Sequence, residues 1–217
     1  MPSDAATAPD GGSQGVTTNP PILNEQEQAK LRAIAERAIV HGARNRTEPP
    51  DDWHTIVGDS DRLLERRGVF VTVYVGDELH GCLGEIDPYD GLAPATARCA
   101  AHATYADGRF SPVRERELPD LSYKISVMTP LQPVASTDAI VIGRDGLLVR
   151  HERRLGLLLP DVPVEYGWDV PTFLKHLWRK AGFPPDLPLE AVTLASFQTQ
   201  IIPGQLPATD EAPPANA

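Results

Sequence analysis

The stretch from His80 to Glu85 holds the residues whose types and spacing are most suited to chemistry. Its sequence is His-Gly-Cys-Leu-Gly-Glu, and Cys82 is one of two cysteines in the 217-residue chain. A thiolate is the reactive form of cysteine, and a nearby cation lowers the pKa of the thiol. His80 stands two residues before Cys82, so the pair suits covalent catalysis with Cys82 as nucleophile or group acceptor. The alternative is a small buried residue, which free cysteine usually is.

Gly81 and Gly84 lie close to Cys82 in the same strand pattern. A glycine inside a strand removes a side chain and lets another backbone or a ligand come close. We therefore expect both glycines to open the surface beside the thiol to a substrate. Glu85 has the chemistry of a general base. Because it falls on the opposite strand face from Cys82, a joint role requires a bulge or a twist.

Two residues farther along the chain are candidates for substrate binding. Arg109 lies in the loop at residues 107–112 (Asp-Gly-Arg-Phe-Ser-Pro), where a guanidinium can clamp a carboxylate or a phosphate with its fork of donors. It can equally tie the loop to Glu115 or Glu117. Tyr166 can line a cleft between two lobes, or it can be a hydrogen-bonded structural phenol.

A β-hairpin has to position the Cys82 stretch. The first strand alternates valine with other residues at Val69, Val71, Val73 and Val75. Residues 76–78 (Gly-Asp-Glu) form a turn, and residues 79–86 return as the second strand. Side chains alternate across a strand, so His80, Cys82 and Gly84 are expected on one face. Gly81 and Glu85 are expected on the other.

Helices and further strands surround this hairpin. We expect the first helix to begin after Asn24, where Glu27 completes a capping box, and to end near Gly42. The other predicted elements are helices at residues 92–106 and after Asp169, and strands at residues 121–128, 146–151, 155–159 and 191–201. Since hairpins mix with separated helices, the predicted class is α+β. We expect a largely antiparallel sheet flanked by helices, with a smaller second lobe and a cleft between the lobes.

Composition and charge restrict the possible partners and location. The net charge of -10 and the pI near 5.0 argue against binding to nucleic acid or to anionic membranes. No apolar run approaches the ~20 residues that span a bilayer, and the start is unlike a secretory signal, so we expect a cytoplasmic protein. Polar, proline-rich ends predict disordered tails at residues 1–21 and 203–217 around a domain at residues 22–202. The excess of arginine over lysine is typical of a GC-rich bacterial genome.

Sequence motifs for cofactors are absent, so no cofactor and no metal are predicted. None of the six histidines forms a His-x-x-x-His pair, and neither cysteine belongs to a Cys-x-x-Cys motif. The chain also lacks a Walker loop and a Gly-x-Gly-x-x-Gly motif. Two cysteines cannot form the three-cysteine cluster of radical SAM enzymes, so any radical chemistry has to come from a partner protein.

Three motifs carry a resemblance to a known family. The run from Val69 to Gly84, ending in His-Gly-Cys-Leu-Gly, resembles the Arg-Gly-Cys-Ile-Gly strand motif of the AMMECR domain family, whose prokaryotic members are called AmmeMemoRadiSam system protein A. Residues 107–112 with 117–119 (Glu-Leu-Pro) are also similar, as are 156–160 (Gly-Leu-Leu-Leu-Pro) with 165–169 (Glu-Tyr-Gly-Trp-Asp). The resemblance covers roughly residues 25–197 and implies an α+β fold of two lobes with a cleft. The biochemical activity of the family is poorly defined.

The resemblance also implies partners. The family name reflects genes that occur beside, or fused to, those of a Memo-like protein and a radical SAM protein, so a shared pathway or complex is expected. Many relatives have arginine where this chain has His80. The charge at that position becomes dependent on pH, which puts in doubt any role that requires a permanent cation.

Two functions follow from these observations. In the first, the chain is an enzyme or a substrate-handling component, in which Cys82 reacts with or holds a small polar or anionic ligand. That function requires a solvent-reachable Cys82 in a concave, polar pocket. In the second, the chain is a non-catalytic binding or scaffold module. It then has an exposed apolar patch and can bury the thiol.

Overall fold

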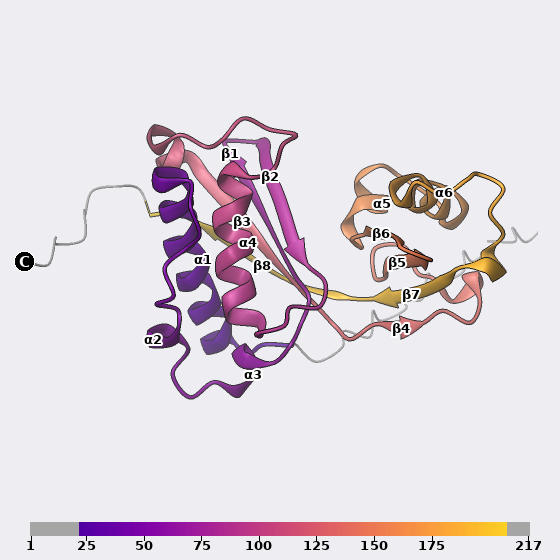
Figure 1. The fold of residues 1–217 in the computed structure, drawn as a ribbon, viewed down its shortest axis with the longest axis horizontal. Coiled ribbons are helices and arrows are strands. Elements are labelled where there is room, and N and C mark those ends of the chain that lie inside the picture. Colours follow the sequence, from indigo (N-terminus) through magenta and orange to yellow (C-terminus); the bar gives the residue numbers. More distant parts are fainter. Residues whose placement is uncertain (1–21, 208–217) are drawn as a thin grey trace, which may run out of the picture.

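The computed structural model of the chain describes residues 22–207. The larger lobe holds an antiparallel sheet of β1 (Val69–Val75), β2 (Glu78–Glu85), β3 (Leu121–Met128) and β8 (Thr199–Gln205), in the order β2-β1-β3-β8. The smaller lobe holds β4 (Gln132–Pro133), β5 (Gly146–His151), β6 (Arg154–Leu158) and β7 (Thr193–Phe197), in the order β4-β7-β5-β6. The predicted α+β class is therefore confirmed (Figure 1). The predicted tail at residues 1–21 lies outside the described residues.

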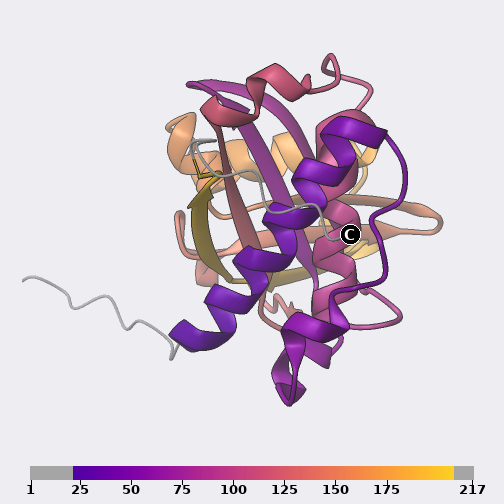
Figure 2. The ribbon, with the colours of Figure 1, turned by 90° about the vertical axis from the view of Figure 1, so that its left-hand side faces the viewer.

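Helices cover one face of the larger sheet, and the smaller lobe lies on its other side. Figure 2 shows α1 (Glu25–Asn45) and α4 (Leu92–Tyr105) side by side in front of the strands. The larger lobe also contains α2 (His54–Val57), α3 (Asp61–Leu64) and the 3-10 helix η1 (Glu115–Asp120). The smaller lobe contains α5 (Asp161–Glu165), α6 (Val170–Ala181) and the 3-10 turns η2 (Thr137–Ala139) and η3 (Leu189–Ala191). Among residues 22–207, no helix is both long and apolar enough to cross a membrane.

The first helix begins as predicted but ends later. The capping box is present, because Asn24 and Glu27 each accept the backbone N–H of the other at 2.9 Å. The predicted end near Gly42 is wrong, since α1 continues to Asn45. Gly42 instead lies at the contact with α4, where a Cβ atom would come within 2.5 Å of the carbonyl oxygen of Ala101. This glycine permits close packing of two helices and does not end one.

The last predicted strand is in fact two strands in different sheets. β7 belongs to the smaller sheet, and β8 continues to Gln205, beyond the expected boundary at residue 203. Pro203 lies in β8 opposite Lys124. Because β8 is an edge strand, a residue without an N–H is tolerated there. Burial of Ile202 and Leu206 in the larger core orders this segment, and residues 208–217 lie outside the described range.

Polar and apolar contacts hold the two lobes together. The two segments that connect the lobes are hydrogen-bonded to each other. Thr129 N–H donates to the carbonyl oxygen of Gln198 at 2.9 Å, and Gln198 N–H donates to Thr129 Oγ1 at 2.8 Å. Lys124 on β3 forms an ion pair with Asp161 on α5. A shared apolar cluster includes Phe70, Ile86, Met128, Leu148, Leu157, Leu159 and Phe197. The smaller lobe therefore sits in a defined position against the larger sheet.

Replacing Gly42 with alanine tests the contact between α1 and α4. Alanine in a helix interior usually stabilises by about 0.5–1 kcal/mol relative to glycine. Here the added methyl group meets the backbone of Ala101, so we expect Gly42→Ala to lower the free energy of unfolding by about 1–3 kcal/mol in urea denaturation. Gly108→Ala is the matched control, because nothing lies within 4 Å of a Cβ atom built there. A stabilising effect at Gly42 contradicts the packing role.

Candidate functional site

Cys82 lies within β2, on the face of the larger sheet that is turned toward the smaller lobe. It is paired with Thr72 of β1. Gly81 faces α4 on the other side of the sheet, and so does Glu85, which is bonded to Arg98 of that helix. From Gly81 to Glu85, the alternation expected from the sequence is therefore observed.

A β-bulge interrupts this alternation at His80. Leu79 pairs with Tyr74 and Gly81 pairs with Val73, so His80 has no Cα partner on β1. Because a bulge breaks the regular alternation of side chains, the sequence argument no longer assigns His80 to the face of Cys82. The Nδ1 atom of His80 is buried and has no hydrogen-bond partner within residues 22–207. A buried polar atom without a partner costs about 1–3 kcal/mol.

The chain itself fills the space beside the two glycines. A Cβ atom at Gly81 would come within 1.9 Å of the carbonyl oxygen of Ala103 in α4. One at Gly84 would come within 2.2 Å of the Phe70 ring. The glycines therefore admit a helix backbone and an aromatic ring, and the expected ligand space beside them is occupied by protein.

Two side chains close the outer edge of β2 at Cys82. β2 is an edge strand, and the outward N–H and C=O groups of such a strand need partners. Cys82 N–H donates to Asp107 Oδ2 at 2.9 Å, and Arg109 Nη2 donates to the carbonyl oxygen of Cys82 at 3.3 Å. These are the two kinds of bond that a neighbouring strand would make, so the loop after α4 fixes the backbone at the thiol.

Asp107 and Arg109 also hold each other. Arg109 donates to Asp107 through Nε at 2.9 Å and through Nη2 at 2.7 Å. The Asp107 side chain is 5% exposed, whereas that of Arg109 is 64% exposed. The Arg109 bonds lower the pKa of Asp107 to about 2, although burial opposes them, and the N–H of Cys82 lowers it further. Arg109 Nη1 takes part in none of these bonds.

The structural partner of Arg109 differs from both predicted partners. Glu115 pairs with Arg44 at 2.8 Å, and Glu117 accepts the backbone N–H of Arg114 at 2.8 Å. Sequence reasoning missed Asp107, which lies in the same loop. The only available signal was its spacing of two residues from the arginine.

The two thiols have different environments. Cys82 is partly exposed, and its Sγ accepts a hydrogen bond from the hydroxyl of Thr72 at 3.3 Å. Cys99 in α4 is buried, and this burial raises its pKa to about 12. Of the two, Cys82 is therefore the more accessible thiol.

Lys180 brings a second cation toward Cys82 from the smaller lobe. The residue is exposed to solvent. Protein atoms nevertheless surround its ammonium group, and this desolvation lowers the pKa of Lys180. The charge of Cys82 raises that pKa, and the charge of Arg109 lowers it. The ammonium therefore lies within electrostatic range of both groups. Sequence reasoning missed Lys180, because nothing in the sequence relates the last turn of α6 to β2.

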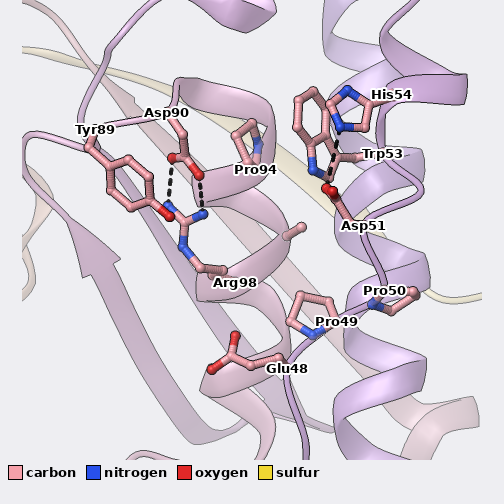
Figure 3. A pocket seen from close by; sticks show the side chains of 11 residues that line it. Glu48, Pro49, Pro50, Asp51, Trp53, His54, Tyr89, Asp90, Pro94 and Arg98 are labelled. Carbon is pink, nitrogen blue, oxygen red and sulfur yellow. Dashed lines mark hydrogen bonds and ion pairs between the residues drawn. The ribbon is translucent and has the colours of Figure 1, made fainter.

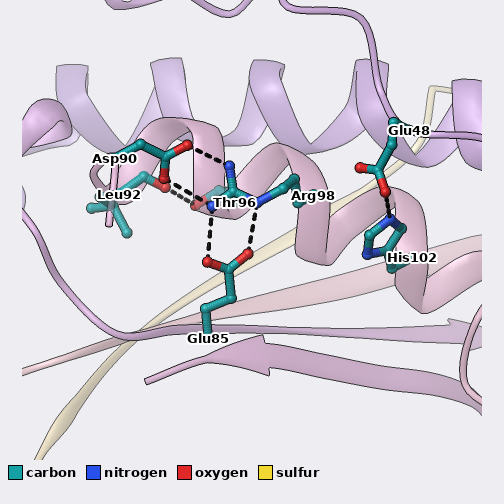
Figure 4. A network of polar contacts seen from close by, with 7 residues as sticks. All are labelled: Glu48, Glu85, Asp90, Leu92, Thr96, Arg98 and His102. Carbon is teal, nitrogen blue, oxygen red and sulfur yellow. Dashed lines mark hydrogen bonds and ion pairs between the residues drawn. The ribbon is translucent and has the colours of Figure 1, made fainter. Parts of the chain in front are cut away.

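The remaining predicted site residues lie elsewhere. Both oxygens of Glu85 accept hydrogen bonds from Arg98 at 2.8 Å, and Arg98 lines a separate cavity (Figures 3 and 4). The bulge in β2 precedes Cys82, so it does not turn Glu85 toward the thiol. Tyr166 is 68% exposed and stacks on Trp168 in the smaller lobe, with ring centroids 5.0 Å apart. No group of three potential metal ligands is found within residues 22–207.

Comparisons with known proteins agree with the fold. The AMMECR1 family model matches residues 32–202. Protein MK0488 of Methanopyrus kandleri is 41% identical over 177 residues, which cover 76% of this chain and 81% of that protein. A protein of Thermococcus gammatolerans is 40% identical over 190 residues, covering 82% and 90%. The crystal structure of uncharacterized protein PH0010 from Pyrococcus horikoshii is similar, with a TM-score of 0.71, 35% identity, and coverage of 82% and 91%. These relatives are archaeal, so they lend no support to the predicted bacterial source.

Removing the Asp107 carboxylate tests how the edge of β2 is held. The pKa of Asp107 is about 2 in the folded protein, against about 3.9 in an unfolded chain. The stabilisation is therefore present above pH ~4 and is lost as the pH falls toward 2, amounting to about 2.5 kcal/mol at neutral pH. We expect Asp107→Asn to lower the free energy of unfolding at pH 7, and the difference from the wild type to shrink between pH 4 and pH 2.

The measurement is urea denaturation across this pH range. Asp87→Asn is the control, because the Asp87 side chain is 79% exposed and pairs with Arg66. A difference between Asp107→Asn and the wild type that does not change with pH contradicts the assigned role.

Proposed function

We propose that this chain, which belongs to the AMMECR1 family, uses the Cys82 thiol to react with or hold a small anionic substrate where its lobes meet. The setting of the sulfur carries the proposal: it is partly exposed, and it accepts a hydrogen bond from Thr72. Two cations, Arg109 and Lys180, lie within electrostatic range. In this role the chain is an enzyme, or the substrate-handling component of a system with a Memo-like protein and a radical SAM protein.

The two cations support both reactivity and binding. Positive charge beside a thiol stabilises the thiolate, and it attracts anionic groups from solution. Arg109 uses Nε and Nη2 to hold Asp107 and the Cys82 backbone, so its Nη1 can donate to a carboxylate or a phosphate. The desolvated ammonium of Lys180 gains from pairing with an anion. With the Asp107 carboxylate bonded to Arg109, these groups leave one net positive charge beside the thiol in a chain of net charge -10.

Addition of the thiol to an electrophilic carbon is the reaction that requires the fewest additional groups at this site. The sulfur forms a bond to a carbonyl carbon or to one carbon of an activated double bond. The π bond of that group breaks, and its electron pair takes up the proton that the thiol releases. No leaving group and no redox partner are required.

Alkylation with charged and neutral reagents tests this function. Iodoacetate is an anion and iodoacetamide is neutral, so their rate ratio at Cys82 reports the local positive charge. We expect both reagents to label Cys82 in the native protein, while the buried Cys99 reacts only after unfolding. The iodoacetate-to-iodoacetamide ratio at Cys82 is expected to exceed that of the denatured chain and to fall about two- to fivefold in Arg109→Gln and in Lys180→Gln.

The controls separate this effect from a general change of charge. Lys175→Gln removes an exposed charge five residues earlier in the same helix and should leave the ratio unchanged. Cys82→Ser identifies the labelled residue by mass spectrometry. If Cys82 labels only after unfolding, or if all three charge variants behave alike, the proposed function is wrong.

A groove along α6 favours a second function, that of a docking module. The groove has a volume of about 770 Å³ and an apolar floor that includes Leu174, Trp178, Phe183 and Leu187. Lys175 and Arg179 lie among its lining residues. Apolar side chains beside basic residues, in a chain of net charge -10, are complementary to an acidic, amphipathic segment of a partner protein. The Memo-like and radical SAM proteins that the family resemblance implies are the partners to test.

Calorimetric titration with each purified partner tests the docking function. We expect binding by at least one of them, weakened about tenfold or more by the double substitution Lys175→Glu and Arg179→Glu, because like charges then oppose the acidic segment. Arg116→Glu reverses an exposed charge on the larger lobe and should bind as the wild type does. Equal binding by the double variant and the wild type refutes the use of this groove.

A further inference from the structure

A cavity of about 320 Å³ lies on the helical side of the larger lobe (Figure 3). It is formed by the loop that follows α1, the start of α2, the turn between β2 and α4, and the first half of α4. In Figure 3, Tyr89 and Asp90 lie on one side and Trp53 and Asp51 on the other. Its lining is acidic and aromatic, and includes Glu48, Asp51, Trp53, Tyr89, Asp90 and Arg98.

The one arginine in this lining has its charge already matched. Arg98 donates to both oxygens of Glu85 at 2.8 Å, and to the two oxygens of Asp90 at 2.6 and 2.8 Å (Figure 4). Glu85 and Asp90 together raise the pKa of Arg98, and Arg98 in turn lowers the pKa of Asp90. Two carboxylates therefore share one guanidinium, and this network contributes net negative charge to the cavity wall.

Two further carboxylates add to this charge. Glu48 contacts His102 at 2.8 Å, and Asp51 contacts His54 at 3.4 Å. Both carboxylates have mostly exposed side chains. Four carboxylates (Glu48, Asp51, Asp90 and the Glu85 behind Arg98) then face one guanidinium, which leaves a balance of three negative charges at this place.

Aromatic rings complete the lining. Tyr89 is 79% exposed and already has a guanidinium 5.4 Å from its ring centroid, that of Arg98. The Trp53 ring lies against the His54 ring, with centroids 3.4 Å apart. A cation near an aromatic face is attracted by the ring quadrupole, and indole and phenol are the strongest such partners among side chains. Acidic groups between aromatic rings thus offer two attractions for the same kind of ligand.

We propose that this cavity binds an organic cation, namely an ammonium or guanidinium group on an alkyl stem, such as the side chain of lysine or arginine. The carboxylates attract the charge, and the Trp53 and Tyr89 rings contact the stem and the cation face. A bare metal ion fits less well, because within residues 22–207 no group of three potential ligands is found. The site stands apart from the proposed thiol function, since Glu85 and Cys82 lie on opposite faces of β2.

Matched ligands that differ only in charge test the proposal. Nα-acetylarginine amide and Nα-acetyllysine amide carry the cation, whereas Nα-acetylcitrulline amide has nearly the shape of the arginine analogue without its charge. The probes are titrated into the full chain at pH 8 and low salt, and binding is followed by calorimetry. We expect the two cationic probes to bind, more weakly as salt is added, and the citrulline analogue to show no binding.

Variants then assign the binding to this cavity. Asp51→Asn removes an exposed charge and Tyr89→Leu removes an exposed ring, so neither change should unfold the protein. Each is expected to weaken binding by about two- to fivefold. Asp87→Asn removes a neighbouring exposed charge that is not part of the lining and should bind as the wild type does. Binding of the citrulline analogue equal to that of the arginine analogue overturns the proposal, and so does equal binding by all three variants and the wild type.

Discussion

The site around Cys82 depends on two hydrogen bonds that stand in for a missing strand. An edge strand leaves backbone groups without partners, and at Cys82 these groups bond to Asp107 and Arg109. Both bonds are made to the same residue, one to its N–H and one to its C=O, so they fix the backbone that carries the sulfur. Binding a substrate and bracing the loop were alternative roles for Arg109 in the sequence. The bracing contacts leave one of its terminal nitrogens outside them, so a single side chain can serve both.

Small residues on α4 determine how closely the elements of the larger lobe approach one another. Gly42 of α1 packs against the backbone of Ala101, and Gly81 of β2 packs against the backbone of Ala103. A side chain at either glycine would separate the layers, and at Gly81 it would displace the strand that holds the thiol. Because β2 lies directly on this helix, its two faces have different surroundings. Glu85 meets Arg98 on the helical side, whereas Cys82 is turned toward the smaller lobe.

Local signals in the sequence predict local structure well. The capping box at Asn24, the β1–β2 hairpin and the helix cap at Asp169 are all present, because each depends on residues only a few positions apart. The misassigned features depend on distant partners. Gly42 has the residue type of a helix end, but its role is to contact Ala101 on another helix. The segment at Pro203 has the composition of a tail, but it pairs with β3. The bulge at His80 likewise depends on the register with β1, which strand alternation alone does not specify.

Dependence on distant partners also explains why part of the candidate site could not be predicted from the sequence. Thr72 lies across a strand pair from Cys82, and Lys180 belongs to the other lobe. Lys180 comes within electrostatic range of the thiol because the smaller lobe is held against the larger sheet. The Thr129–Gln198 bonds, the Lys124–Asp161 ion pair and a shared apolar cluster hold it there. Coulomb energy falls with distance and with solvent screening. The electrostatic environment of Cys82 is therefore a property of how the two lobes are joined, and the motif around the cysteine specifies only one side of it.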